Sequence, residues 1–244
     1  MKIFFKYLLL SIVLINFYPA HSQDRIDAIL ADPTRPAEDR ASDASRMPDA
    51  VLEFFGIGTG DRVADLLAGG GYYTRILAKL VGDDGAVYSG NNPFFARFGD
   101  EALTALLAES GFDNVIRIDG PVDELSLPLD GSLDAAMMIL AYHDLWLTDE
   151  DRNEMNRRIF ASLKSGGVFG IVDHRAADGA GTDMIQSLHR IEQRVIVDEL
   201  TAAGFVLAAS ADFLGNPNDD RSLRIFDPSV RGSTDRFVLR FEKP

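Results

Sequence analysis

Short apolar runs alternate with amphipathic segments through most of the chain after residue 56. The clearest run covers residues 62–66, and the apolar residues Tyr73, Ile76, Leu77 and Leu80 then recur at helical spacing. Regular alternation of strand and helix predicts a parallel sheet with helices on both faces. The expected strands are residues 62–66, 86–89, 115–118, 135–140, 168–172, 206–209 and 237–241.

Helix signals lie between these runs. We expect Asp100 to cap a helix that carries Leu103, Leu106 and Leu107, and Gly111 to follow its end. Residues 24–50 are polar and contain three prolines, so we expect a short helix and a loop there. The other expected helices are residues 48–55, a helix that Thr148 and Asp151 begin as a capping box and that ends at residues 164–167, and residues 193–203.

Three consecutive glycines separate the first strand from its helix. Asp65 lies near the carboxyl end of that strand, and Gly69, Gly70 and Gly71 follow. Glycines let the chain turn sharply and bring backbone N–H groups close to a ligand. Open α/β sheets bind nucleotide-like molecules at such turns. The pattern favours a nucleoside site, and a tight turn without a ligand is the alternative.

The first 22 residues have the pattern of a signal peptide. Lys2 and Lys6 precede an apolar run over residues 7–18, and Ala20 and Ser22 are small residues at the positions that a signal peptidase reads. We expect cleavage after Ser22 and a periplasmic or secreted protein; an uncleaved anchor is the alternative. The chain has no cysteine, which excludes disulfides and a thiol nucleophile.

Charge and composition narrow the range of partners. The formal net charge is −14, and loss of Lys2 and Lys6 with the leader makes it −16. Such a surface repels phosphate backbones, so we expect no nucleic acid as a partner. We expect no stable membrane association after cleavage. We expect residues 23–55 to form a helical preamble and residues 56–244 to form one α/β domain. The apolar content of 46% is ordinary for such a domain.

Several motifs together resemble the class I SAM-dependent methyltransferases. They are Asp65 with the glycine turn, Val87-Tyr88, residues 127–134 before the fourth strand, residues 164–167 before the fifth and residues 202–205 before the sixth. Residues 71–74, Asp173-His174 and residues 227–239 look most similar to a poorly characterised group of exported bacterial predicted methyltransferases. The resemblance implies a doubly wound, mostly parallel seven-stranded sheet of the Rossmann-like kind, with an antiparallel last strand.

The resemblance also implies a cofactor and its site. The cofactor is S-adenosyl-L-methionine (SAM), and the reaction is methylation of an unknown small acceptor. The residues that match the family's cofactor site are Asp65, Ala68, Gly69, Gly70, Gly71, Tyr72, Asn91, Asn92, Asp119, Leu140 and Tyr142. Two positions depart from the family pattern: Leu67 replaces the first glycine, and Asn91 replaces the acid that takes the ribose hydroxyls.

Three histidines follow the later strands. His143 and His174 each lie beside an aspartate after the fourth and fifth strands, and His189 lies further on. Carboxyl ends of parallel strands share one edge, so we expect the first two to face one crevice. A histidine there can act as a general base. Methyl transfer needs mainly orientation of the acceptor, and we assign acceptor positioning or deprotonation to His143, Asp173 and His174.

Other interpretations stay open. The histidines could be loop residues bonded to backbone, or His143, His174 and His189 could hold a metal with Asp144 or Asp173. In the preamble, Arg40, Asp43 and Arg46 form either a lid or surface ion pairs. The alternatives to a methyltransferase are therefore an exported ligand-binding module with a degenerate SAM site, and a metal-dependent enzyme.

Overall fold

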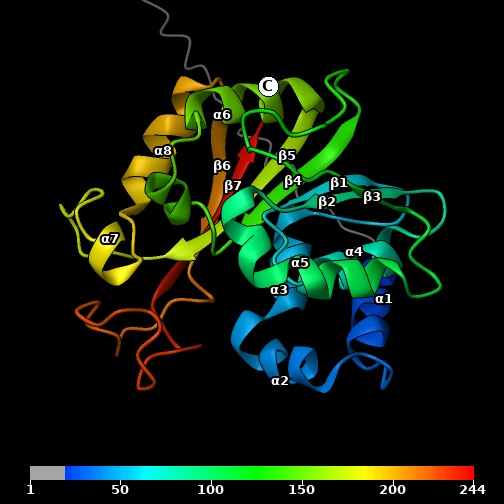
Figure 1. Cartoon of the computed structure of the whole chain (residues 1–244), viewed down its shortest axis with the longest axis horizontal. Helices are drawn as coiled ribbons and strands as arrows, with labels where there is room; N and C mark the ends of the chain where they lie inside the picture. Colours follow the sequence, from blue (N-terminus) through cyan, green and yellow to red (C-terminus); the bar gives the residue numbers. More distant parts are fainter. Residues whose placement is uncertain (1–19) are drawn as a thin grey trace, which may run out of the picture.

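The computed structural model describes residues 20–244, and side chains from residue 23 (Figure 1). Most of the expected signal peptide lies outside the described residues, and Ala20 to Ser22 form the start of α1. The elements are α1 (Ala20–Leu30), α2 (Ala37–Arg46), α3 (Pro48–Phe55), β1 (Arg62–Leu66), α4 (Tyr72–Val81), β2 (Ala86–Gly90), α5 (Pro93–Leu107), β3 (Val115–Arg117), β4 (Leu133–Ile139), the 3-10 helix η1 (His143–Leu147), α6 (Arg152–Ser162), β5 (Leu163–His174), α7 (Ile185–Leu188), α8 (Gln193–Ala202), β6 (Val206–Ala211) and β7 (Arg236–Glu242).

The strands form one seven-stranded sheet in the order β3-β2-β1-β4-β5-β7-β6. The strands from β1 to β5 pair in parallel, and β7 pairs antiparallel with both β5 and β6. This confirms the expected doubly wound, mostly parallel sheet with an antiparallel last strand. The order reverses at β1 and β4, so the crevice beyond their carboxyl ends is the topological switch point.

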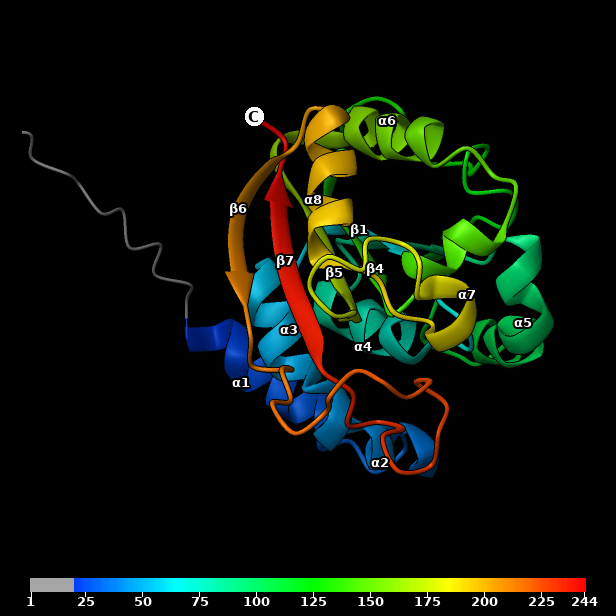
Figure 2. The same cartoon turned by 90° about the vertical axis from the view of Figure 1, so that its left-hand side faces the viewer.

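Apolar side chains pack against both faces of the sheet, because the central strands are buried on both sides. On one face, Leu77 of α4, Leu103 of α5 and Phe55 of α3 pack with Val63 of β1. On the other, residues of α6 and α8 such as Ile159 pack around β4, β5 and β7. Figures 1 and 2 show α6 and α8 on the opposite side of the sheet from α3 and α4.

The apolar runs located every strand, but two caps differ from the prediction. Asp100 lies within α5, which begins eight residues earlier because the Asn92 side chain accepts a hydrogen bond from Phe95 N at 2.9 Å. Asp151 caps α6 by itself, accepting from the backbone of Asn153 and Glu154. The α6 helix also ends at Ser162, where β5 begins directly.

Three helices precede the sheet, one more than the sequence predicts. The additional helix, α2, is strongly polar, which is why its apolar pattern is weak. Helix α1 packs on α4, and α3 packs on β5 and β7. Figure 2 shows α2 beside the C-terminal loop between β6 and β7. Within residues 20–244, no helix is both long and apolar enough to span a bilayer.

Candidate functional site

The turn between β1 and α4 has the conformation that glycines permit. Gly69 and Gly71 have φ angles of 58° and 87°. Leu67 also has a positive φ, 56°, although its side chain is buried in the core. At the end of neighbouring β4, Leu140 has a φ of 58°. Such conformations cost of order 1–3 kcal/mol in non-glycine residues and cluster at functional sites.

A cavity of about 600 Å³ borders this turn. That volume suits a small organic ligand or cofactor. The predicted residues Asp65, Ala68, Gly69, Gly70, Tyr72 and Leu140 all line the cavity. Tyr73 of α4 also lines the cavity. The sequence did not identify the other lining residues in and just after α4 and α5, which are Arg75, Phe95, Ala102, Ala105, Leu106 and Glu109.

Asp65 is the buried acid of this cavity. Its carboxylate is 2% exposed and accepts a hydrogen bond from the Thr74 hydroxyl at 2.6 Å. Burial raises the pKa of Asp65 to about 6, although Thr74 and Arg46 act in the opposite direction. An acid with an elevated pKa in a cavity is a typical functional-site residue.

Helix α2 forms one wall of the cavity through Glu38, Asp39 and Arg46. Tyr72, the first residue of α4, ties this wall to the glycine turn. Its hydroxyl donates to Asp43 at 2.6 Å, and the guanidinium of Arg46 lies over its ring at 4.6 Å from the centroid. Asp43 also accepts two hydrogen bonds from Arg35. It therefore forms a structural ion pair with Arg35 and also anchors α2 to α4 through Tyr72.

The Asn91 side chain closes the glycine turn from the other side. Its Oδ1 accepts from Gly69 N at 2.8 Å, and its Nδ2 donates to Gly69 O at 2.9 Å. A carboxylate could make the first bond but not the second. Helix α5 also lies directly against the turn: a Cβ on Gly99 would lie 2.2 Å from the carbonyl carbon of Gly69. Asn91 is 1% exposed and does not line the cavity.

Four other predicted cofactor residues lie outside the cavity lining. Gly71 caps α4. Asn92 caps α5 and donates to Glu150 at 2.7 Å. Asp119 accepts from Asn91 N at 3.1 Å and pairs with Arg117. The Tyr142 hydroxyl donates to Glu199 at 2.6 Å, on the face that α8 covers.

The predicted catalytic residues do lie together. His143 Nδ1 is 2.7 Å from Asp173 Oδ1, and the His143 and His174 rings are 5.7 Å apart. His143 Nε2 is buried without a hydrogen-bond partner; Asp144 Oδ1 lies 3.3 Å away, close enough for an ion pair. The same Asp144 Oδ1 also lies 2.9 Å from His189 Nδ1, so Asp144 links the two histidines.

The two central histidines have opposite protonation tendencies. Burial opposes a charge on His143, but the adjacent Asp173 and Asp144 outweigh it and raise its pKa to about 10. Burial, and then the charge of His143, lower the pKa of His174 well below the ordinary value. At neutral pH His143 is therefore an imidazolium and His174 a neutral imidazole, whose Nδ1 is 2.7 Å from Thr234 Oγ1.

The metal alternative gathers a different set of ligands from the one expected. Atoms of His143, Asp144 and His189 lie within 4.8 Å of one another, while His174 is not part of this set. His189 Nε2 lies 3.0 Å from Arg224 Nη2, an obligatory donor. This contact requires a lone pair on Nε2 and hence a proton on Nδ1, where a metal would bind. The contacts therefore favour a hydrogen-bonded network.

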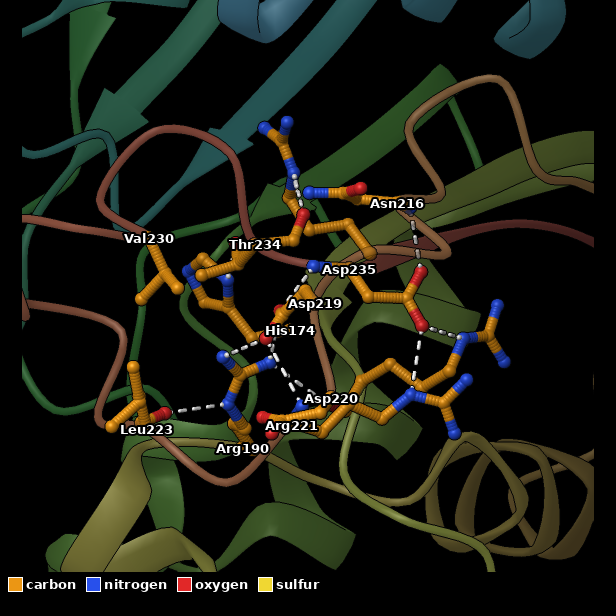
Figure 3. Close-up of polar contacts among 12 residues, drawn as sticks. His174, Arg190, Asn216, Asp219, Asp220, Arg221, Leu223, Val230, Thr234 and Asp235 are labelled. Carbon is orange, nitrogen blue, oxygen red and sulfur yellow. Dashed lines mark hydrogen bonds and ion pairs between the residues drawn. The ribbon is translucent and has the colours of Figure 1, made fainter.

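The loop between β6 and β7 lies beside this network, and charged contacts hold the loop in place (Figure 3). Arg190 is fully buried and binds Asp219 with two hydrogen bonds, of 2.8 and 3.1 Å. Asp219 in turn accepts from Asp235 N, and Thr234 contacts His174. Sequence reasoning missed these residues, although Thr234 and Asp235 belong to a stretch that carries the family resemblance.

No protein-family model and no curated protein matches the sequence. Solved structures do match the fold. A SAM-dependent methyltransferase from Aquifex aeolicus has a TM-score of 0.58 at 20% identity, over 90% of this chain and 97% of that chain. One from Mesorhizobium loti has a TM-score of 0.56 at 16% identity, over 82% of this chain and 98% of that chain.

The cyclase SpnF matches to a similar degree, with a TM-score of 0.59 at 19% identity, over 82% of this chain and 81% of that chain. The fold of this chain is therefore that of the class I SAM-dependent methyltransferases. At such identities the likeness concerns the fold alone. A cyclase among the matches illustrates that one fold can serve several chemistries, so activity must be argued from the site.

Proposed function

We propose that this protein is a SAM-dependent methyltransferase that acts on a small acceptor. The observation that carries the proposal is the cavity at the topological switch point, where Asp65 and the glycine turn face an aromatic wall from Tyr72 and Tyr73. Its volume and mixed polar and apolar lining fit SAM. Asp65, Ala68 to Gly70 and Leu140 would hold it, with Asn91 and Asp119 behind the turn. When bound, SAM supplies an activated methyl group.

The chain's own residues would position and deprotonate the acceptor. His174 is unprotonated at neutral pH, because burial and the charge of His143 lower its pKa. It is therefore the histidine with a free lone pair for a proton from the acceptor, although the lowered pKa makes it a weak base. His143 is already protonated there, so its part is to hold charge and orientation. Asp173 fixes both: its carboxylate accepts from His143 N at 2.9 Å and from His174 N at 2.7 Å. Asp173 is therefore a positioning residue.

One observation favours a second candidate, an exported ligand-binding module with a degenerate SAM site. Asn91 spends one donor and one acceptor on the Gly69 peptide and is almost fully buried. A ribose could use only its remaining acceptor and donor, and only if α5 moved away from the turn. Such a domain would keep the cavity for a smaller ligand.

Calorimetry with SAM and S-adenosylhomocysteine (SAH) on residues 23–244 separates these candidates. A transferase should bind both, and Asp65→Ala should weaken binding at least 10-fold, while Asp84→Ala in an exposed turn should not. Asn91→Asp loses the bond to Gly69 O, which should loosen the turn and let its carboxylate reach the ribose once α5 moves away. It should therefore tighten SAH binding. Absence of heat from wild type at millimolar SAH would favour the ligand-binding module.

We also propose that the protein acts outside the cytoplasm after cleavage at Ser22, as in the exported group that the sequence resembles. The basic start and the apolar run of residues 7–18 support this. Amino-terminal sequencing of protein from separated cell fractions tests it: a mature chain should begin at Gln23. A full-length chain that begins at Met1 in the cytoplasm would contradict export.

A further inference from the structure

Arg236 is a buried cation at the edge of the sheet where β5 ends with His174. It is the first residue of β7 and lies directly opposite His174 in the antiparallel ladder with β5. Directly opposed residues of an antiparallel pair project to the same face of the sheet. Arg236 is only 7% exposed. The guanidinium therefore belongs to the surroundings of the neutral histidine.

Within residues 20–244, Arg236 forms no ion pair. No carboxylate lies within 4.0 Å of the Arg236 guanidinium, whose one hydrogen bond runs from Nε to Thr234 O at 3.3 Å. The nearest acid in sequence, Asp235, already pairs with Arg175 at 3.3 Å and Arg221 at 2.9 Å (Figure 3). A buried charge without a counter-ion is costly, so such groups are usually paired.

Arg46, at a half-buried position, is a second cation without an ion-pair partner. It lines the cavity from the end of α2, and no carboxylate of the described chain forms an ion pair with it. Its ring partner Tyr72 lies next to Tyr73, whose hydroxyl has no hydrogen-bond partner within the described residues. The segment before β7 also lies against the end of α2: a Cβ at Gly232, four residues before Arg236, would lie 3.9 Å from Cβ of Ser45, the neighbour of Arg46. In keeping with this, burial lowers the pKa of Arg236, and the nearby charge of Arg46 acts in the same direction.

We propose that Arg236 and Arg46 form an anion-binding subsite, and that the molecule presented to His174 is an acid with a carboxylate or phosphate group. Guanidinium groups bind these oxyanions with paired hydrogen bonds. The assignment of this molecule as methyl acceptor rests on the proposed transferase function. The amino-acid carboxylate of SAM has the same chemistry, so the test must separate the two sources.

The probe is inorganic phosphate, measured by calorimetry and thermal unfolding of residues 23–244 at constant ionic strength. Phosphate should bind wild type and raise its Tm. Arg236→Gln and Arg46→Gln should each lose at least 10-fold in phosphate affinity. Arg157→Gln is the matched control, because that side chain is 63% exposed and pairs with Glu154. Equal phosphate binding by wild type and Arg236→Gln would overturn the proposal.

Misfolding of the variants can be distinguished from a specific loss of phosphate affinity. Arg236→Gln removes an uncompensated buried charge, so its Tm without phosphate should equal or exceed that of wild type. Arg46 ends a helix at a half-buried position, so Arg46→Gln gives an independent reading if the first variant misfolds. Unchanged phosphate affinity in Arg46→Gln would also overturn the two-arginine subsite.

Saturating SAH distinguishes the source of the anion. Phosphate affinity that is unchanged by SAH supports an acceptor subsite. Competition between the two ligands would overturn the acceptor assignment, because the arginines would then hold the cofactor's carboxylate. If SAH does not bind at all but phosphate binding still depends on Arg236, the transferase function fails while the anion subsite stands.

Discussion

The carboxylate of Asp65 lies inside the protein at the end of β1, with Thr74 as its hydrogen-bond donor. Its pKa in the folded protein, about 6, exceeds the ordinary value of 3.8. Such a group destabilises the fold once it ionises, so its effect is absent below about pH 4 and complete above pH 6. A binding site can keep a buried acid that lowers the stability of the fold, because the same carboxylate then binds the ligand.

Asp65→Asn should therefore raise the free energy of unfolding at pH 7.5, by about 1 to 3 kcal/mol. The asparagine oxygen can still accept from Thr74, so the change removes mainly the buried charge. Urea unfolding at pH 7.5 and at pH 4 measures the effect, which should shrink at the lower pH. Asp84→Asn, in an exposed turn, should have no effect at either pH. A gain that is the same at both pH values would contradict the explanation.

The buried pair of Arg190 and Asp219 should behave in the opposite way. Arg190→Ala leaves the Asp219 carboxylate buried without its cation, which should cost about 3 to 5 kcal/mol of unfolding free energy. Chemical denaturation provides the measurement. Arg194→Ala is the control, because that side chain is 78% exposed, and it should stay within about 0.5 kcal/mol of wild type. A loss below about 1 kcal/mol for Arg190→Ala would show that the loop network is dispensable.

At the scale of elements, helix α5 is unusual in how closely it approaches the glycine turn. Gly99→Ala should destabilise the protein by about 1 to 3 kcal/mol, because its Cβ would lie 2.2 Å from the Gly69 carbonyl carbon. In an exposed helix the same change would stabilise by about 1 kcal/mol. The sign of the change in thermal unfolding is thus the test. A stabilised variant would mean that α5 lies further from the turn.

The sequence predicts elements well where the signal is local. The strand at 62–66 is one apolar run, and the structure has it with the same bounds. The start of α5 was missed because Phe98 and its neighbours do not follow an apolar helical face; Phe98 is 76% exposed. The early start of β5 was missed because Lys164 and the glycines at 166 and 167 have the composition of a turn.

The candidate site divides in the same way. Asp65 and the glycines are adjacent in sequence, so their pattern revealed them. The bond from Asn91 to Gly69 joins residues 22 positions apart, and sequence alone does not reveal it. The opposition of Arg236 and His174 depends on strand order and register, which no local pattern encodes.

For the molecule as a whole, two buried groups set a common pH trend. The raised pKa of His143, about 10 against an ordinary 6.5, contributes stability that is complete below pH 6.5 and lost as pH rises through 10. Asp65 adds a destabilisation that develops between about pH 4 and about pH 6 and stays constant above that range. Both effects favour the folded state on the acidic side of neutrality.

The free energy of unfolding should therefore fall by about 2 to 4 kcal/mol between pH 7 and pH 10. Urea titrations across this range would show the slope. His143→Gln should be less stable at pH 7, because Asp173 loses its partner, but its curve should be flatter above pH 7. An equally steep curve in that variant would assign the alkaline loss to other groups.

The hydrogen bond from Tyr72 to Asp43 has a consequence for how a ligand enters and leaves the cavity. The Tyr72 hydroxyl connects α2 to α4, the helix that follows the glycine turn. By thermodynamic linkage, a ligand bound between α2 and α4 stabilises the docked position of α2 by the same free energy by which docked α2 stabilises the bound ligand. Without α2, the glycine turn would be an open surface, from which a ligand would dissociate faster.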